Sequence, residues 1–76
     1  MPVEKSPAVR ALGEAIRSAR RERGYGQEGF AAHVGLDRSY FGAIERGEFN
    51  VTVDTTMTIA KGLKVPAAEL FKRAKL

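Results

Sequence analysis

Apolar side chains recur every three or four residues along most of the chain, which is the spacing of one face of an α-helix. The first such stripe starts at Ala8 and ends at Gly24, a residue type that readily leaves helical geometry. Its apolar members are Val9, Leu12, Ile16 and Ala19. Because no stretch alternates apolar and polar residues for long enough to predict a strand, the pattern indicates an all-α chain.

Two short helices are predicted in the middle of the chain. One covers residues 27–34 and ends at Gly35, with Gly26 before it where a Ser or Thr cap is more usual. The other runs over residues 38 to about 46, and Asp37 can cap its start. Only three residues separate these helices, and the first of them is a glycine that can turn the chain. The two helices are therefore expected to cross steeply, as in a helix-turn-helix.

Two more helices are predicted in the last third of the chain. Thr52 can cap the first of them, and Pro66 opens the second. At the other end, residues 1–7 contain two prolines and no periodic pattern, which is typical of a flexible arm. The expected organisation is a flexible arm at 1–7 followed by a single domain of five short helices at 8–76.

Composition narrows the class of protein. A length of 76 residues suits one small domain with a thin core, and a net charge of +4 fits an anionic partner. The chain has no cysteine, no apolar run near the length of a membrane span, and no apolar signal segment in its first ten residues. We therefore expect a cytoplasmic protein that does not enter the membrane.

The sequence offers little for catalysis or metal binding. His33 is the only histidine, so a zinc site of the usual kind lacks ligands. No serine has an evident histidine and carboxylate arranged with it, and neither a phosphate-binding loop nor a dinucleotide fingerprint occurs. We expect no enzyme activity, no metal and no cofactor.

The two central helices have the residue spacing of a bacterial helix-turn-helix. Counting from Gln27, the small Ala31 is fifth, Gly35 is ninth, and the apolar Phe41 and Ile44 are fifteenth and eighteenth. The small residue lets the helices approach, the glycine turns the chain, and the apolar pair fills the angle between them. Within a basic domain, this spacing predicts binding to double-stranded DNA.

The chain resembles the Cro/C1-type (XRE) family of bacterial helix-turn-helix transcriptional regulators from about residue 10 to 72. Family positions are occupied by the runs QEGFA, IERGEFN, IAKGL and LKVPAAELF. Within the family, the length and the run LDRSYFGAIERGEFNVT are similar to the controller proteins of restriction–modification systems. The departures are Gly26 and Gly29 in the second helix, Val51 where Pro is frequent and Thr56 where Leu is frequent. The resemblance implies a lambda-repressor-like fold and sequence-specific DNA binding.

The resemblance also implies that helix 38–46 lies in the DNA major groove, N-terminal end first. One face of this helix is polar near its ends and almost bare in its middle, which suits close approach to base edges. An arginine there can read guanine O6 and N7, and an alanine can touch a thymine methyl. Tyr40 can instead pack in the core, and Gly42 can serve packing alone. The candidate contacts are Arg38, Ser39, Tyr40, Gly42 and Ala43.

Further positions follow from the same resemblance. Gln27 lies where the family meets the phosphate backbone, at the start of a helix whose amides are unpaired. Arg46 and Asn50 come after the recognition helix and are further candidates for phosphate contact. In the family, the positions of Arg20 and Glu45 pair across the core, so we expect a buried or half-buried ion pair between them.

We expect a homodimer, because a single small helix-turn-helix unit touches only a few base pairs. Two-fold pairing suits a palindromic operator with half-sites one helical turn apart, roughly 34 Å. The candidate interface is the surface of the last two helices. The alternative for Val53 and Phe71 is that they belong to the core. A second class of function is an antitoxin or interaction module whose main partner is a protein. The candidate interface residues are Val53, Met57, Phe71 and Leu76.

Overall fold

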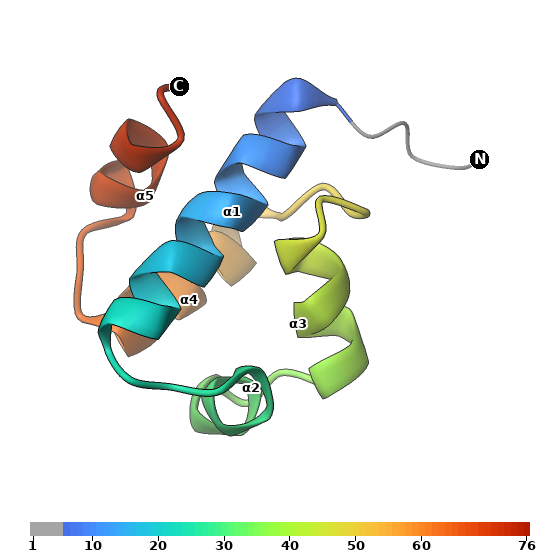
Figure 1. The fold of residues 1–76 in the computed structure, drawn as a ribbon, viewed down its shortest axis with the longest axis vertical. Helices are drawn as coiled ribbons and strands as arrows, with labels where there is room; N and C mark the ends of the chain where they lie inside the picture. The colour runs from blue at the N-terminus through green and yellow to red at the C-terminus, as the bar shows by residue number, and fades with distance from the viewer. Residues whose placement is uncertain (1–5) are drawn as a thin grey trace.

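The computed structural model describes residues 6–76, and within that range the chain forms five α-helices and no strand. Helix α1 crosses the middle of the molecule, with α5 on one side and α3 on the other, while α2 lies at one end (Figure 1). The all-α architecture predicted from the sequence is confirmed. The helices are α1 (Pro7–Glu22), α2 (Gln27–Val34), α3 (Arg38–Glu45), α4 (Val53–Leu63) and α5 (Ala67–Arg73). None of these five helices combines the length and the hydropathy needed to cross a bilayer.

Local signals in the sequence set the bounds of α2, α3 and α4. Asp37 Oδ2 accepts a hydrogen bond of 3.1 Å from the amide three residues later, and Thr52 Oγ1 accepts one of 3.1 Å at the same spacing. Helix α2 starts after Gly26 without a side-chain cap, as expected. Gly35 and Gly47 follow α2 and α3 with φ of 75° and 74°, a conformation in which glycine carries no steric penalty.

The first helix starts earlier than predicted. Pro7 is its first residue, and Ser6 caps it by accepting a hydrogen bond of 3.1 Å from the amide of Val9. Proline suits this position because its missing N–H would be unpaired in any case and its φ is already helical. The predicted arm is therefore wrong at residues 6 and 7, and residues 1–5 lie outside the described part of the chain.

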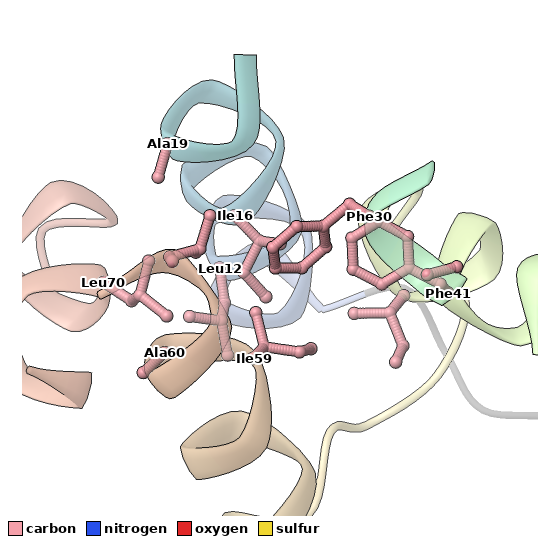
Figure 2. Packing of buried hydrophobic residues seen from close by; sticks show 11 residues of the cluster. Leu12, Ile16, Ala19, Phe30, Phe41, Ile59, Ala60 and Leu70 are labelled. Atoms are coloured by element: carbon pink, nitrogen blue, oxygen red, sulfur yellow. The ribbon is translucent and has the colours of Figure 1, made fainter. Parts of the chain in front are cut away.

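A single apolar cluster receives side chains from all five helices (Figure 2). The rings of Phe30 and Phe41 lie side by side in it, with centroids 5.3 Å apart, and so join α2 to α3. Leu36, in the turn between these helices, packs against the same cluster. The large side chains with almost no exposed surface are Phe30, Phe41, Ile16, Ile44, Ile59, Leu63 and Leu70.

Helices α1 and α3 approach so closely that a side chain does not fit between them at Gly13. A Cβ atom at this position would lie 2.5 Å from the carbonyl oxygen of Ile44 and 2.6 Å from that of Glu45. Both oxygens belong to backbone, which cannot rotate away as a side chain would. The glycine therefore allows the end of α3 to rest directly on α1.

On the opposite face of the molecule, Arg73 of α5 is held by two carboxylates. It donates hydrogen bonds of 2.7 and 2.8 Å to the two carboxylate oxygens of Glu22 and one of 3.3 Å to Glu69. The hydrogen bond from Arg73 lowers the pKa of Glu22 and, in turn, raises the pKa of the arginine. This network ties the short α5 to the end of α1.

Two glycine substitutions should have opposite effects on stability. Gly13→Ala should destabilise the fold by about 1–3 kcal/mol, because the added methyl forces two packed helices apart. Gly29→Ala lies in the exposed part of α2, where no atom comes within 4 Å of the new Cβ, and should stabilise the fold by up to about 1 kcal/mol. Urea unfolding followed by circular dichroism measures both changes. A Gly13→Ala variant as stable as the parent would contradict the close contact of α1 and α3.

Candidate nucleic-acid interface

The exposed face of α3 surrounds a shallow hollow with Gly42 at its base. Arg38 and Ser39 stand in the first turn of the helix, and Arg46 directly follows its last residue. These side chains and Gln27 line a hollow of about 210 Å³. A Cβ atom on Gly42 would lie 3.1 Å from Arg46 Nη1 and 3.2 Å from Gln27 Oε1, so both side chains reach over the glycine. Gly42 itself is buried beneath these two side chains, so this part of the face has no side chain of its own, and close approach of Gly42 to DNA stays a prediction.

The structure corrects one assignment on this face. Ala43 is 4% exposed and belongs to the core. Each helical residue turns by about 100°, so Ala43 points well away from the hollow at Gly42. The chain after α3 also folds back here, since the amide of Glu48 donates a hydrogen bond of 2.9 Å to the carbonyl of Ala43. The prediction that the Ala43 methyl contacts a base is therefore wrong.

Tyr40 lies at the margin of this face and is half-buried. Its ring packs against the apolar cluster and lies 6.1 Å, between centroids, from the ring of Phe49. The packing role considered for Tyr40 is therefore present, while contact of its hydroxyl with DNA stays a prediction. Sequence reasoning missed Phe49, which is 46% exposed. The available signal was a phenylalanine placed between Glu48 and Asn50 in a polar turn.

A buried ion pair joins the end of α3 to α1. Arg20 Nε donates to one oxygen of Glu45 at 2.8 Å and Arg20 Nη2 donates to the other at 3.1 Å, with side chains only 6% and 2% exposed. Arg20 Nη1 also donates a hydrogen bond of 2.8 Å to the carbonyl of Tyr25. Within the described residues, every buried polar side-chain atom has a hydrogen-bond partner. The ion pair expected between Arg20 and Glu45 is present.

Gln27 connects this pair to the surface. Its Nε2 donates a hydrogen bond of 2.9 Å to Glu45 Oε1, while its Oε1 lies over Gly42. The start of α2, which carries no side-chain cap, is thereby held beside the exposed face of α3. Two helices that are consecutive in the chain thus present one continuous surface.

A larger cleft continues from this surface toward α1 and has a volume of about 510 Å³. At its rim, Arg46 Nε and Nη2 donate hydrogen bonds of 2.9 and 3.2 Å to the two carboxylate oxygens of Glu48. Hydrogen bonding to this carboxylate raises the pKa of the Arg46 guanidinium. The remaining lining residues are Arg10, Glu14, Arg17, Gln27 and Glu45.

A second surface, on α4 and α5, is apolar. Val53 is 78% exposed and Phe71 is 38% exposed, so the alternative that placed these two residues in the core is wrong. Met57 and Leu76 are also exposed. A recess of about 130 Å³ lies among the side chains of Val53, Met57 and Phe71. Beneath it, Thr56 is buried, and its hydroxyl donates a hydrogen bond of 2.9 Å to the carbonyl of Thr52.

Comparison with known proteins identifies the family to which this chain belongs. A family described as a helix-turn-helix domain matches residues 13–76. The chain therefore belongs to the Cro/C1-type (XRE) helix-turn-helix family, whose members are DNA-binding transcriptional regulators.

Among its relatives are proteins of the restriction–modification controller type. Control protein C.SmaI of Serratia marcescens is 40% identical over 65 residues, covering 86% of this chain and 77% of that protein. Control protein C.MunI of a Mycoplasma species is 38% identical over 61 residues, covering 79% of this chain and 82% of that protein. The crystal structure of the restriction-modification controller protein C.AhdI from Aeromonas hydrophila matches with a TM-score of 0.82 at 35% identity, covering 86% of this chain and 98% of that one. Wild-type controller protein C.Esp1396I matches with a TM-score of 0.83 at 33% identity, covering 92% of this chain and 91% of that one.

Removal of one member of the buried ion pair should strongly destabilise the domain. Arg20→Met leaves the carboxylate of Glu45 buried without its charged partner, which should cost about 3–5 kcal/mol of unfolding free energy. Replacement of both residues, in Arg20→Met/Glu45→Leu, should recover a large part of that loss because no charge stays buried. Urea denaturation of the three proteins tests this expectation. An Arg20→Met variant that unfolds at the same urea concentration as the parent would count against it.

Proposed function

We propose that this protein binds a palindromic DNA operator as a homodimer and thereby controls transcription from the adjacent promoter. Helix α3 of each subunit enters the major groove with its N-terminal end first. The observation that carries the proposal is the face of α3 on which Arg38, Ser39 and Arg46 line a hollow over Gly42, which has no side chain of its own.

Base reading is assigned to the first turn of α3. Arg38 is exposed at the first helical position, so its guanidinium extends ahead of the helix toward the base edges. Its fork can donate two hydrogen bonds to guanine O6 and N7, and Ser39 beside it can donate to a base or a phosphate. Gly42 offers no side chain that would hold the helix away from the groove floor.

Phosphate contact is assigned to the margins of this face. Gln27 stands at the start of α2, where backbone amides without a side-chain cap attract an anion. Arg46 and the exposed Asn50 follow α3 and lie on the chain that leaves the groove. Such contacts set the register of the protein on the duplex without reading sequence.

The dimer contact is assigned to the apolar surface of α4 and α5. Its candidate members Val53, Met57, Phe71 and Leu76 are all exposed in the single chain. A group of exposed apolar side chains on a small domain indicates a partner surface. A second copy of the chain suits it, because two-fold symmetry would place two copies of α3 in successive turns of the major groove.

Loss of Arg38 and loss of Gln27 should have different effects on DNA binding. Arg38→Ala should cost about 1–3 kcal/mol on the preferred site and little on scrambled DNA, because only the correct base presents the matching acceptors. Gln27→Ala should weaken both complexes about equally, because every sequence presents the same phosphates. The site is first obtained by selection from a random duplex library, and affinities are then measured on matched duplexes.

Two outcomes would contradict these assignments. Equal losses for Arg38→Ala on both duplexes would remove this residue from base reading. If the parent protein bound no duplex at all, DNA binding itself would be wrong, and the exposed face of α3 would become a candidate surface for a protein partner. A stoichiometric protein that co-purified with the chain would then support the antitoxin alternative.

The dimer should depend on Met57 and not on its exposed neighbour. Met57→Glu places a charge in the apolar surface and should convert the dimer to a monomer, because burial of an unpaired carboxylate is unfavourable. Thr58→Glu adds the same charge to the same helix at the next exposed position and should leave the dimer intact. Equilibrium sedimentation measures both, and circular dichroism confirms the fold. A parent chain that is entirely monomeric at high micromolar concentration would rule out the dimer.

A further inference from the structure

The ion pair between Arg46 and Glu48 occupies the rim of the recognition face. Arg46 reaches back along α3, with Nη1 over the position where Gly42 lacks a side chain. Its Nε and Nη2 donate to the two oxygens of Glu48 at 2.9 and 3.2 Å. The two side chains are 57% and 36% exposed, so solvent reaches both charges. Arg46, the arginine best placed to contact a phosphate beside α3, therefore already donates hydrogen bonds to the carboxylate of Glu48.

The geometry leaves part of the guanidinium available. An arginine carries five N–H groups, and Glu48 accepts from one on Nε and one on Nη2. One N–H group of Nη1 and the second one of Nη2 form another edge, which can donate to a phosphate in the same bidentate manner. Glu48 can therefore hold one edge of Arg46 while a phosphate meets the other.

The charges of the two side chains in this pair cancel each other. Because a phosphate approaching the rim meets the arginine together with its carboxylate, Glu48 cancels the charge that Arg46 would otherwise contribute. Electrostatic attraction to phosphates is the main source of affinity for DNA of any sequence. The cleft behind the pair is also lined by Arg10, Arg17 and Glu14, while Glu45 in its wall is already neutralised by the buried Arg20, so the surrounding charge is slightly positive and Glu48 offsets part of it.

We propose that Glu48 is a specificity residue that acts through Arg46, weakening binding to DNA in general more than binding to the operator. This inference rests on the proposed DNA-binding function. On DNA without the operator sequence, α3 is not seated by base contacts, and Glu48 simply cancels one phosphate-binding charge. On the operator, Arg38 and Ser39 seat the helix. There, the fixed orientation of Arg46 toward its phosphate offsets the repulsion from Glu48.

The test compares Glu48→Gln with the parent protein on operator and scrambled duplexes over a salt series. Affinity for scrambled DNA should rise about three- to tenfold at 0.1 M salt, and the slope of log affinity against log salt should steepen by about one unit. The factor by which affinity for the operator rises should be less than half of the factor for scrambled DNA. The ratio of operator to scrambled affinity should therefore fall.

Glu22→Gln is the matched control. It makes the same change of charge and also breaks a bidentate pair with an arginine, Arg73 of α5. Helices α5 and α3 lie on opposite sides of α1 (Figure 1), so this variant should leave both affinities and the salt slope unchanged. Circular dichroism confirms that both variants are folded.

A double variant tests whether Glu48 acts through Arg46. In the Arg46→Ala background, Glu48→Gln should give less than half of the gain that it gives in the parent. A gain of the same size in both backgrounds would mean that Glu48 repels DNA by itself, and would overturn the inference.

Other results would also overturn it. These are an unchanged salt slope, equal gains on operator and scrambled DNA, or a loss of affinity on both. Each of them leaves the proposed function standing, because the parent protein still binds its operator. Absence of any binding by the parent would instead remove the proposed function together with this inference.

Discussion

The bidentate ion pair between Arg20 and Glu45 is the interaction on which the DNA-facing surface depends. Four hydrogen bonds meet at it and join α1, the turn before α2, the start of α2 and the end of α3. Two charges of this kind are stable in a protein interior only when all of their donors and acceptors are satisfied. That requirement fixes the position of Gln27 relative to α3.

Close packing reinforces this arrangement at the same place. The carbonyl groups of Ile44 and Glu45 rest on Gly13 of α1, so the end of α3 can move neither inward nor along α1 without a clash. Helix α3 has only eight residues and would not be stable alone. Its rigidity comes from the core through Phe41 and Ile44. A rigid support of this kind suits a surface that must match base edges closely.

The domain presents two surfaces of different chemistry. The face of α3 is polar, and it includes an ion pair between Arg46 and Glu48. The surface of α4 and α5 is apolar, although a chain of this size has few apolar residues to spare from its core. An exposed valine and an exposed phenylalanine there, Val53 and Phe71, are explained more simply by a partner than by folding. DNA reading and assembly are thereby assigned to different helices.

The sequence by itself determined the features that depend on near neighbours in the chain. The bounds of α2 and the start of α3 follow from glycines, a capping aspartate and helical spacing, all of which act within one or two turns. Resemblance to a family added the buried ion pair, which no local pattern predicts. Only the tertiary structure decided how each side of α3 is covered, because the chain after the helix folds over Ala43, whereas Gly42 is covered by the side chains of Arg46 and Gln27. It also decided that Val53 and Phe71 are exposed, since apolar character alone cannot separate a core from an interface. Likewise, the pairing of Arg46 with Glu48 depends on the path of a turn, and therefore on packing distant in the chain.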